Sequence, residues 1–252
     1  MAQRQRKPQA KAAGPNLKPF YWLLGLIAVL GVGWIGMSAL KGSEAAQEPI
    51  QLSAEALANS QELVKLGRGV KKGPDNAPIR ILVFSDYTCP ACRQFTTNVE
   101  PGMRQDFIDG GKVQIVYHDF PLGGAGHQWG FVAARAARCA EDLGKFWEYH
   151  DLLFARQDQW RFSQSVPTGR FESYAEELQL DAKAFKACLN SNRHQDIVTA
   201  NKALGAQLGV GSTPTLFMSP SGTHLDQEWR DYALMKARLE KELGVTTSAG
   251  PK

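Results

Sequence analysis

Two cysteines separated by two residues, Cys89 and Cys92, form a C-P-A-C segment. Three kinds of chemistry use this spacing: zinc binding, a small structural disulfide, and exchange between a dithiol and a disulfide. A zinc site needs four ligands, usually two such pairs, but the other cysteines, Cys139 and Cys188, lie far from this pair and from each other. A structural disulfide at this spacing closes so small a loop that it stabilises a fold little. The residue types therefore favour redox chemistry and no metal.

The elements expected around Cys89 favour the same chemistry. Residues 79–85 form an apolar, β-rich run typical of a buried strand, and residues 90–109 predict a helix that ends at two glycines. Cys89 would then face the free N–H groups and the positive end of the helix dipole, which stabilise a thiolate and lower the pKa of the thiol. Cys92, one turn further along the helix, would be more buried, and its thiol would form or break the disulfide with Cys89.

The remaining pattern is a strand, a block of helices, two strands and a helix. Residues 112–119 predict a strand parallel to the first, because a β-α-β connection has a right-handed crossover. Residues 126–143, 146–156, 174–178, 182–190 and 194–208 have helical periodicity, 215–218 and 223–226 predict strands around a turn, and 227–243 predict a closing helix.

Three segments together resemble a known family. FSDYTCPACRQF, the helical segment AARAARCAEDLGKFWEYHDLLF and GSTPTLF are similar to the DsbA-like thiol:disulfide oxidoreductases. The resemblance covers about residues 75–243. It implies an α/β fold of the thioredoxin type, a central mixed sheet flanked by helices, with a helical insertion at about residues 126–192. It implies no cofactor.

The resemblance also assigns roles to residues. Cys89 would be the nucleophile and Cys92 its partner. Thr213 and Pro214, with a cis peptide bond between them, would offer backbone hydrogen bonds to an extended substrate peptide, as an added β-strand does. The best-known oxidases of the family carry a histidine before the second cysteine, and that position is Ala91 here.

Two other positions near the motif bear on proton transfer. Pro90 fits the first turn of a helix, where its missing N–H costs nothing, and with the residue after it sets the redox potential. Many thioredoxin-like proteins place a buried acid six residues before the first cysteine, where this chain has Val83. Proton transfer at Cys92 would then need another group or water. Asp86 is close in sequence, but we expect it to make local hydrogen bonds.

The beginning of the chain predicts export. Hydrophobic residues make up 43% of the 252 residues, and the net charge of +4 is concentrated before the first acidic residue, Glu44. Residues 1–19 form a basic tail, and residues 20–40 carry no charge and are long enough to span a bilayer. Positive residues stay inside, so the rest would lie on the periplasmic or extracellular side of the cytoplasmic membrane.

We expect this segment to be an uncleaved, single-pass anchor. The alternative is a cleavable signal peptide, whose apolar region is usually shorter, about 7 to 15 residues. Residues 41–74 would form a stalk with a short amphipathic helix, residues 75–245 the domain, and residues 246–252 a flexible tail. Either alternative exports the domain.

Export also favours a disulfide between the second pair of cysteines, because disulfides persist outside the cytoplasm. We expect Cys139 and Cys188 to form a structural disulfide, worth up to about 4 kcal/mol by the loop-entropy model. The alternative is two buried free cysteines. His118, His127 and His150 are expected to be hydrogen-bonded core or surface residues, because a lone histidine is more often such a residue than a base.

The leading functional hypothesis is a membrane-anchored disulfide oxidase. It would pass the Cys89–Cys92 disulfide to reduced exported proteins through a mixed disulfide on Cys89, and a quinone-coupled membrane protein similar to DsbB would re-oxidise it. One alternative is a reductase or isomerase kept reduced by a membrane electron donor. Another is a non-catalytic chaperone or assembly module. The sequence shows no sign of nucleic-acid binding.

Overall fold

This computed structural model describes Leu52 and residues 60–244 of the chain. The predicted basic tail (1–19), membrane segment (20–40) and C-terminal tail (246–252) lie outside the described residues, and the predicted stalk is described only in part. Within the described part, no helix combines the length and the apolar character needed to cross a membrane. The first described helix is α3, Ser60–Leu66.

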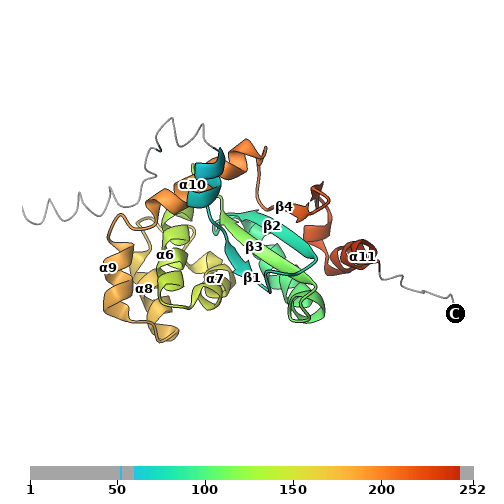
Figure 1. The fold of residues 1–252 in the computed structure, drawn as a ribbon. Coiled ribbons are helices and arrows are strands. Elements are labelled where there is room, and N and C mark those ends of the chain that lie inside the picture. Colours follow the sequence, from blue (N-terminus) through green and yellow to red (C-terminus); the bar gives the residue numbers. More distant parts are fainter. Residues whose placement is uncertain (1–51, 53–59, 245–252) are drawn as a thin grey trace, which may run out of the picture. The chain divides into compact units, whose positions relative to one another are not determined.

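A five-stranded mixed sheet organises the described residues (Figure 1). Its strand order is β1-β3-β2-β4-β5; β2 and β3 run parallel, as predicted, and the other neighbours are antiparallel. The strands are β1 (Val70–Lys72), β2 (Ile79–Ser85), β3 (Val113–Asp119), β4 (Thr215–Ser219) and β5 (Thr223–His224).

Strand β1 differs from the sequence expectation. It pairs with β3 and lies ahead of residue 75, where we expected the domain to begin. Its sequence, VKK, has one apolar residue, and the strand occupies an edge of the sheet. An edge strand needs only one neighbour and tolerates lysine, so it leaves no apolar run in the sequence.

The helix after the C-P-A-C segment is continuous but not uniform. It comprises α4 (Pro90–Gln94), η1 (Phe95–Val99), α5 (Glu100–Met103) and η2 (Arg104–Ile108), where η1 and η2 are wider, π-helical turns. The prediction of one regular helix over 90–109 is therefore corrected. Pro101 has no N–H, so the regular bond to the carbonyl of Thr97 cannot form, and a wider turn lies at that point.

The helices of the insertion follow β3 in the chain and lie beside the sheet (Figure 1). Helix α6 packs against α7 and α9 and is buried over most of its length. It begins at Gly130 rather than at 126, because residues 123–129 form a glycine-rich loop. The helices are α6 (Gly130–Asp142), α7 (Phe146–Ala155), α8 (Thr168–Glu177) and α9 (Ala182–Leu189), followed by α10 (Gln195–Gln207), which packs on α3.

The closing helix is shorter than predicted. A turn of 3-10 helix, η4 (Glu228–Arg230), precedes α11 (Tyr232–Glu242). Asp231 separates them with an extended backbone, and its carboxylate accepts hydrogen bonds from the N–H groups of Ala233 and Leu234. This N-cap fixes the start of α11, so the predicted single helix over 227–243 is corrected.

Candidate active site

Strand β2 and helix α4 position the two cysteines. Cys89 has an extended backbone (φ −79°, ψ 123°) at the N-cap of α4, Pro90 begins the helix, and Ala91 is half-buried in its first turn. Both sulfurs are free thiols. Cys89 is 7% exposed and Cys92 is fully buried, so an incoming sulfur reaches Cys89 first.

The loop before β4 lies against Cys89. The Thr213–Pro214 peptide bond is cis, and the Cys89 thiol donates a hydrogen bond to the carbonyl oxygen of Thr213 at 3.3 Å. Two segments 124 residues apart in the chain therefore meet at one sulfur.

The environment separates the two thiols chemically. The pKa of Cys89 is lowered to about 6, chiefly by a hydrogen bond from Cys92, and also by the side chain of Thr213 and the backbone N–H groups of Cys92 and Ala91; burial opposes the shift. Burial is the largest cause of the raised pKa of Cys92, and the hydrogen bond and charge of Cys89 add to it. The lowered pKa of Cys89 favours its thiolate at neutral pH, and the raised pKa of Cys92 favours its thiol.

Val83 and Asp86 are the two positions that bear on proton transfer at Cys92. Val83 is 1% exposed in β2, so an apolar side chain occupies the position of the family's buried acid. The backbone N–H of Asp86 lies 3.5 Å from the Cys92 sulfur. The Asp86 carboxylate accepts the expected local hydrogen bonds from the backbone and hydroxyl of Thr88, and also a long-range one from the backbone of Leu122, which the sequence did not predict.

Two residues that sequence reasoning missed support the site. Gln157, in a 3-10 turn after α7, donates hydrogen bonds to the carbonyl oxygens of Tyr87 (2.8 Å) and Cys89 (2.9 Å). His127 contacts both Asp86 (3.0 Å) and Thr88 (2.7 Å). The signal for His127 was present in the topology: the carboxyl ends of parallel β2 and β3 meet at one edge of the sheet, so the loops that follow them are neighbours.

The other two histidines behave as expected. His118 is buried, hydrogen-bonded to Asn201 at 2.7 Å and stacked on Phe84. His150 is fully buried, lies 3.0 Å from Asp151 and is surrounded by aromatic rings. Both are part of the packing of the core.

The second cysteine pair lies in the helical insertion. Cys139 of α6 and Cys188 of α9 form a disulfide with a Cα–Cα distance of 5.8 Å. They are 0% and 5% exposed. A nitrogen of His194 lies within 4.8 Å of both sulfurs, but the bond between the sulfurs removes them as thiolate ligands for a metal.

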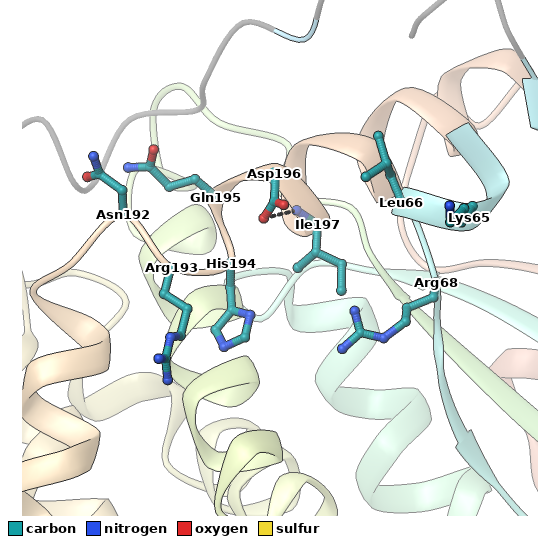
Figure 2. A pocket seen from close by; sticks show the side chains of 9 residues that line it. All are labelled: Lys65, Leu66, Arg68, Asn192, Arg193, His194, Gln195, Asp196 and Ile197. Atoms are coloured by element: carbon teal, nitrogen blue, oxygen red, sulfur yellow. Dashed lines mark hydrogen bonds between the residues drawn. The ribbon is translucent and has the colours of Figure 1, made fainter. Parts of the chain in front are cut away.

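A basic pocket lies between the end of α3 and the start of α10 (Figure 2). Its basic side chains face the acidic end of α6: Arg193 lies 3.0 Å and His194 2.9 Å from Asp142, and Arg68 lies 3.9 Å from Glu141. The pocket is therefore largely neutralised within the fold. None of the residues that line it belongs to the Cys89 site.

Comparisons with known proteins agree with this geometry. The sequence model of the family described as thioredoxin matches residues 66–235. Over 171 residues, the chain is 26% identical to disulfide bond formation protein D of Bacillus subtilis, covering 68% of this chain and 75% of that protein. The crystal structure of oxidised BdbD from B. subtilis is 27% identical, with a TM-score of 0.61 over 72% of this chain and 95% of that one.

A different kind of relative matches only in part. The chain is 33% identical over 153 residues to Na(+)/H(+) antiporter NhaA 3 of Salinispora tropica, and the match covers 61% of this chain but only 22% of the antiporter. The chain thus spans about a fifth of that relative. With the family match over 66–235 and the geometry of its two cysteines, the chain belongs to the thioredoxin family, among the DsbA-like thiol:disulfide oxidoreductases.

Proposed function

We propose that the protein is a membrane-anchored, extracytoplasmic disulfide oxidase. The observation that carries this proposal is the contrast between Cys89, 7% exposed at the start of α4 with its pKa lowered to about 6, and the fully buried Cys92, whose pKa is raised. A stabilised thiolate at Cys89 favours the reduced form of the pair, so the disulfide form accepts electrons readily. This is the property of a disulfide donor.

The reaction transfers two electrons from a substrate dithiol to the Cys89–Cys92 disulfide. A substrate thiolate attacks the Cys89 sulfur, a mixed disulfide forms, and Cys92 leaves and takes up a proton, as its raised pKa requires. The second substrate thiol loses its proton and attacks the substrate sulfur of the mixed disulfide. Cys89 then leaves as a thiolate, and its low pKa makes it a good leaving group.

The loop at Thr213 and Pro214 supports a role in binding the substrate peptide. It lies beside Cys89 and leads into β4, so an extended peptide placed along it would bring a cysteine to the exposed side of the Cys89 sulfur. The substrates of this proposal are reduced exported proteins. The oxidant that restores the disulfide is a quinone-coupled membrane protein, which takes up the two electrons. Residues 20–40 would hold the domain at the membrane.

The decisive measurement is the redox potential of the Cys89–Cys92 pair in the full chain, determined by equilibration with glutathione. An oxidase is expected near the −120 mV region, whereas about −270 mV is the reducing, thioredoxin-like end. The variant Cys139→Ala/Cys188→Ala serves as the matched control, because only the active pair can exchange in it. A potential at the reducing end would reject the oxidase in favour of the reductase or isomerase alternative.

A further inference from the structure

The Asp86 carboxylate joins the loops that follow β2 and β3. Its Oδ1 accepts from the backbone and hydroxyl of Thr88, and its Oδ2 accepts from the backbone of Leu122 at 2.9 Å and lies 3.0 Å from Nδ1 of His127. The first residue of α6, Gly130, permits this approach, because a Cβ there would lie 2.6 Å from Oδ1. The Asp86 side chain is 0% exposed, whereas the His127 side chain is 23% exposed.

These contacts fix the tautomer of His127. The Thr88 hydroxyl gives its hydrogen to Asp86 Oδ1 at 2.7 Å, so its oxygen faces His127 Nδ1, also at 2.7 Å, as an acceptor. Both neighbours of Nδ1 are therefore acceptors, and Nδ1 carries a hydrogen in either charge state. The proton that makes the ring an imidazolium enters and leaves at Nε2.

The charged groups around His127 belong to three elements. Asp86, in the loop after β2, raises the pKa of the histidine most, by its hydrogen bond and its charge; burial opposes the shift. Cys89 at the start of α4 raises that pKa through its charge, and Arg161, in the loop after η3 (Gln157–Gln159), lowers it. His127 is thus within electrostatic reach of Cys89, and it contacts Thr88, the residue immediately before that cysteine.

We propose that His127 is a positioning residue for disulfide exchange: its imidazolium, held by Asp86, stabilises the Cys89 thiolate from outside the C-P-A-C segment. The inference rests on the proposed role of Cys89 as the exchanging sulfur. Ala91 provides no charge inside the C-P-A-C segment. The imidazolium of His127, on a neighbouring loop, provides a positive charge from outside it. The imidazolium interacts with the thiolate of the reduced pair and not with the neutral disulfide, so it favours the form that has accepted electrons.

The coupling has a defined direction with pH. When His127 loses its Nε2 proton, the thiolate loses a neighbouring positive charge, and the pKa of Cys89 rises. Because coupling between two sites is reciprocal, the thiolate must raise the pKa of His127 by the same amount. A merely structural histidine would hold the loop in place and show neither effect.

The first test uses the unmodified full chain. The pKa of His127 is measured by NMR from the pH dependence of its ring signals, once with Cys89 and Cys92 reduced and once with them oxidised. We expect a higher value in the reduced protein, by up to about one unit, because the Cys89 thiolate is an opposite charge within electrostatic reach of the ring. Equal values in the two redox states would overturn the proposal, whatever the protein's activity.

The second test uses the variant His127→Gln, whose amide can still donate a hydrogen bond to Asp86. The alkylation rate of Cys89 is measured against pH, and its midpoint is expected to rise by up to about one unit, which is up to a tenfold loss of thiolate below the midpoint. His224→Gln, at an exposed histidine of β5, is the matched control and should keep the wild-type midpoint. An unchanged midpoint in His127→Gln would overturn the proposal.

These outcomes are distinct from those that test the oxidase. A reducing redox potential would reject the proposed function. The role of His127 would still be decided by the pKa of His127 and the alkylation midpoint of Cys89. An oxidising potential together with an unshifted Cys89 midpoint in His127→Gln would keep the function and reject the role of His127.

Discussion

Both cysteine pairs of this protein can form a disulfide, but they lie in opposite environments. Cys89 and Cys92 are at the start of a helix, three residues apart, and one sulfur is partly accessible with a pKa of about 6. Cys139 and Cys188 join two helices, 49 residues apart in the chain, and both are buried. In the proposed function, the first pair exchanges its bond and the second keeps it.

The comparison shows that position, not residue type, assigns the chemistry. The N-terminus of α4 supplies backbone N–H groups to Cys89, and a neighbouring loop brings Thr213 to the same sulfur. At the second pair, a long loop between the cysteines makes the bond valuable for stability. Changes at the first pair should therefore alter reactivity, and changes at the second should alter the free energy of unfolding.

The largest effect is expected from Cys89→Ser. A serine cannot form the mixed disulfide, so the oxidation of a reduced peptide substrate should fall to the uncatalysed rate. The measurement is the rate of disulfide formation in a peptide that contains two cysteines. Cys139→Ala/Cys188→Ala is the matched control and should retain the wild-type rate within about threefold. Full activity in Cys89→Ser would instead favour a non-catalytic binding module.

The second effect is on stability. Cys139→Ala/Cys188→Ala should lower the free energy of unfolding by up to about 4 kcal/mol, because the bond closes a loop of about 50 residues. The measurement is denaturation of the full chain by urea under oxidising conditions. The variant Cys89→Ala/Cys92→Ala should lose about 2 kcal/mol at most by the same loop relation. A larger loss at Cys89 and Cys92 than at the second pair would contradict the comparison.

Much of the active site could be predicted from the sequence because its signals are local. The apolar strand β2, the C-P-A-C segment and Pro90 are contiguous, and their order places Cys89 at a helix start. The proximity of Thr213 to Cys89 followed only from the resemblance to a family, since no local pattern reports a contact across 124 residues.

What the sequence did not predict depends on tertiary contacts. His127 looks like an ordinary loop residue, and only the parallel pairing of β2 and β3 brings it to Asp86. Gln157 likewise acts on backbone carbonyls 68 and 70 residues away. Strand β1 and the N-cap Asp231 were missed for another reason: a three-residue edge strand and a single cap contribute too few residues to a periodic pattern.

The smallest of the three effects is a pH dependence of stability that differs between the redox states of the first pair. An unfolded cysteine has a pKa of about 8.5, and that of Cys89 in the folded protein is lowered to about 6. A lowered acid pKa contributes stability that is fully present above the unfolded value and is lost as the pH falls through the folded value. The reduced protein should therefore gain stability relative to the oxidised protein between about pH 6 and 8.5.

Above about pH 8.5 the sign reverses. The pKa of Cys92 is raised in the folded protein, so an unfolded Cys92 releases its proton first and the unfolded state is favoured. Urea denaturation of Cys139→Ala/Cys188→Ala, oxidised and reduced, measures the difference at several pH values, because reductant then acts on the first pair alone. Parallel pH curves for the two redox states would mean that Cys89 has the pKa of an ordinary cysteine, and the contrast between the two pairs would then be one of burial and loop length only.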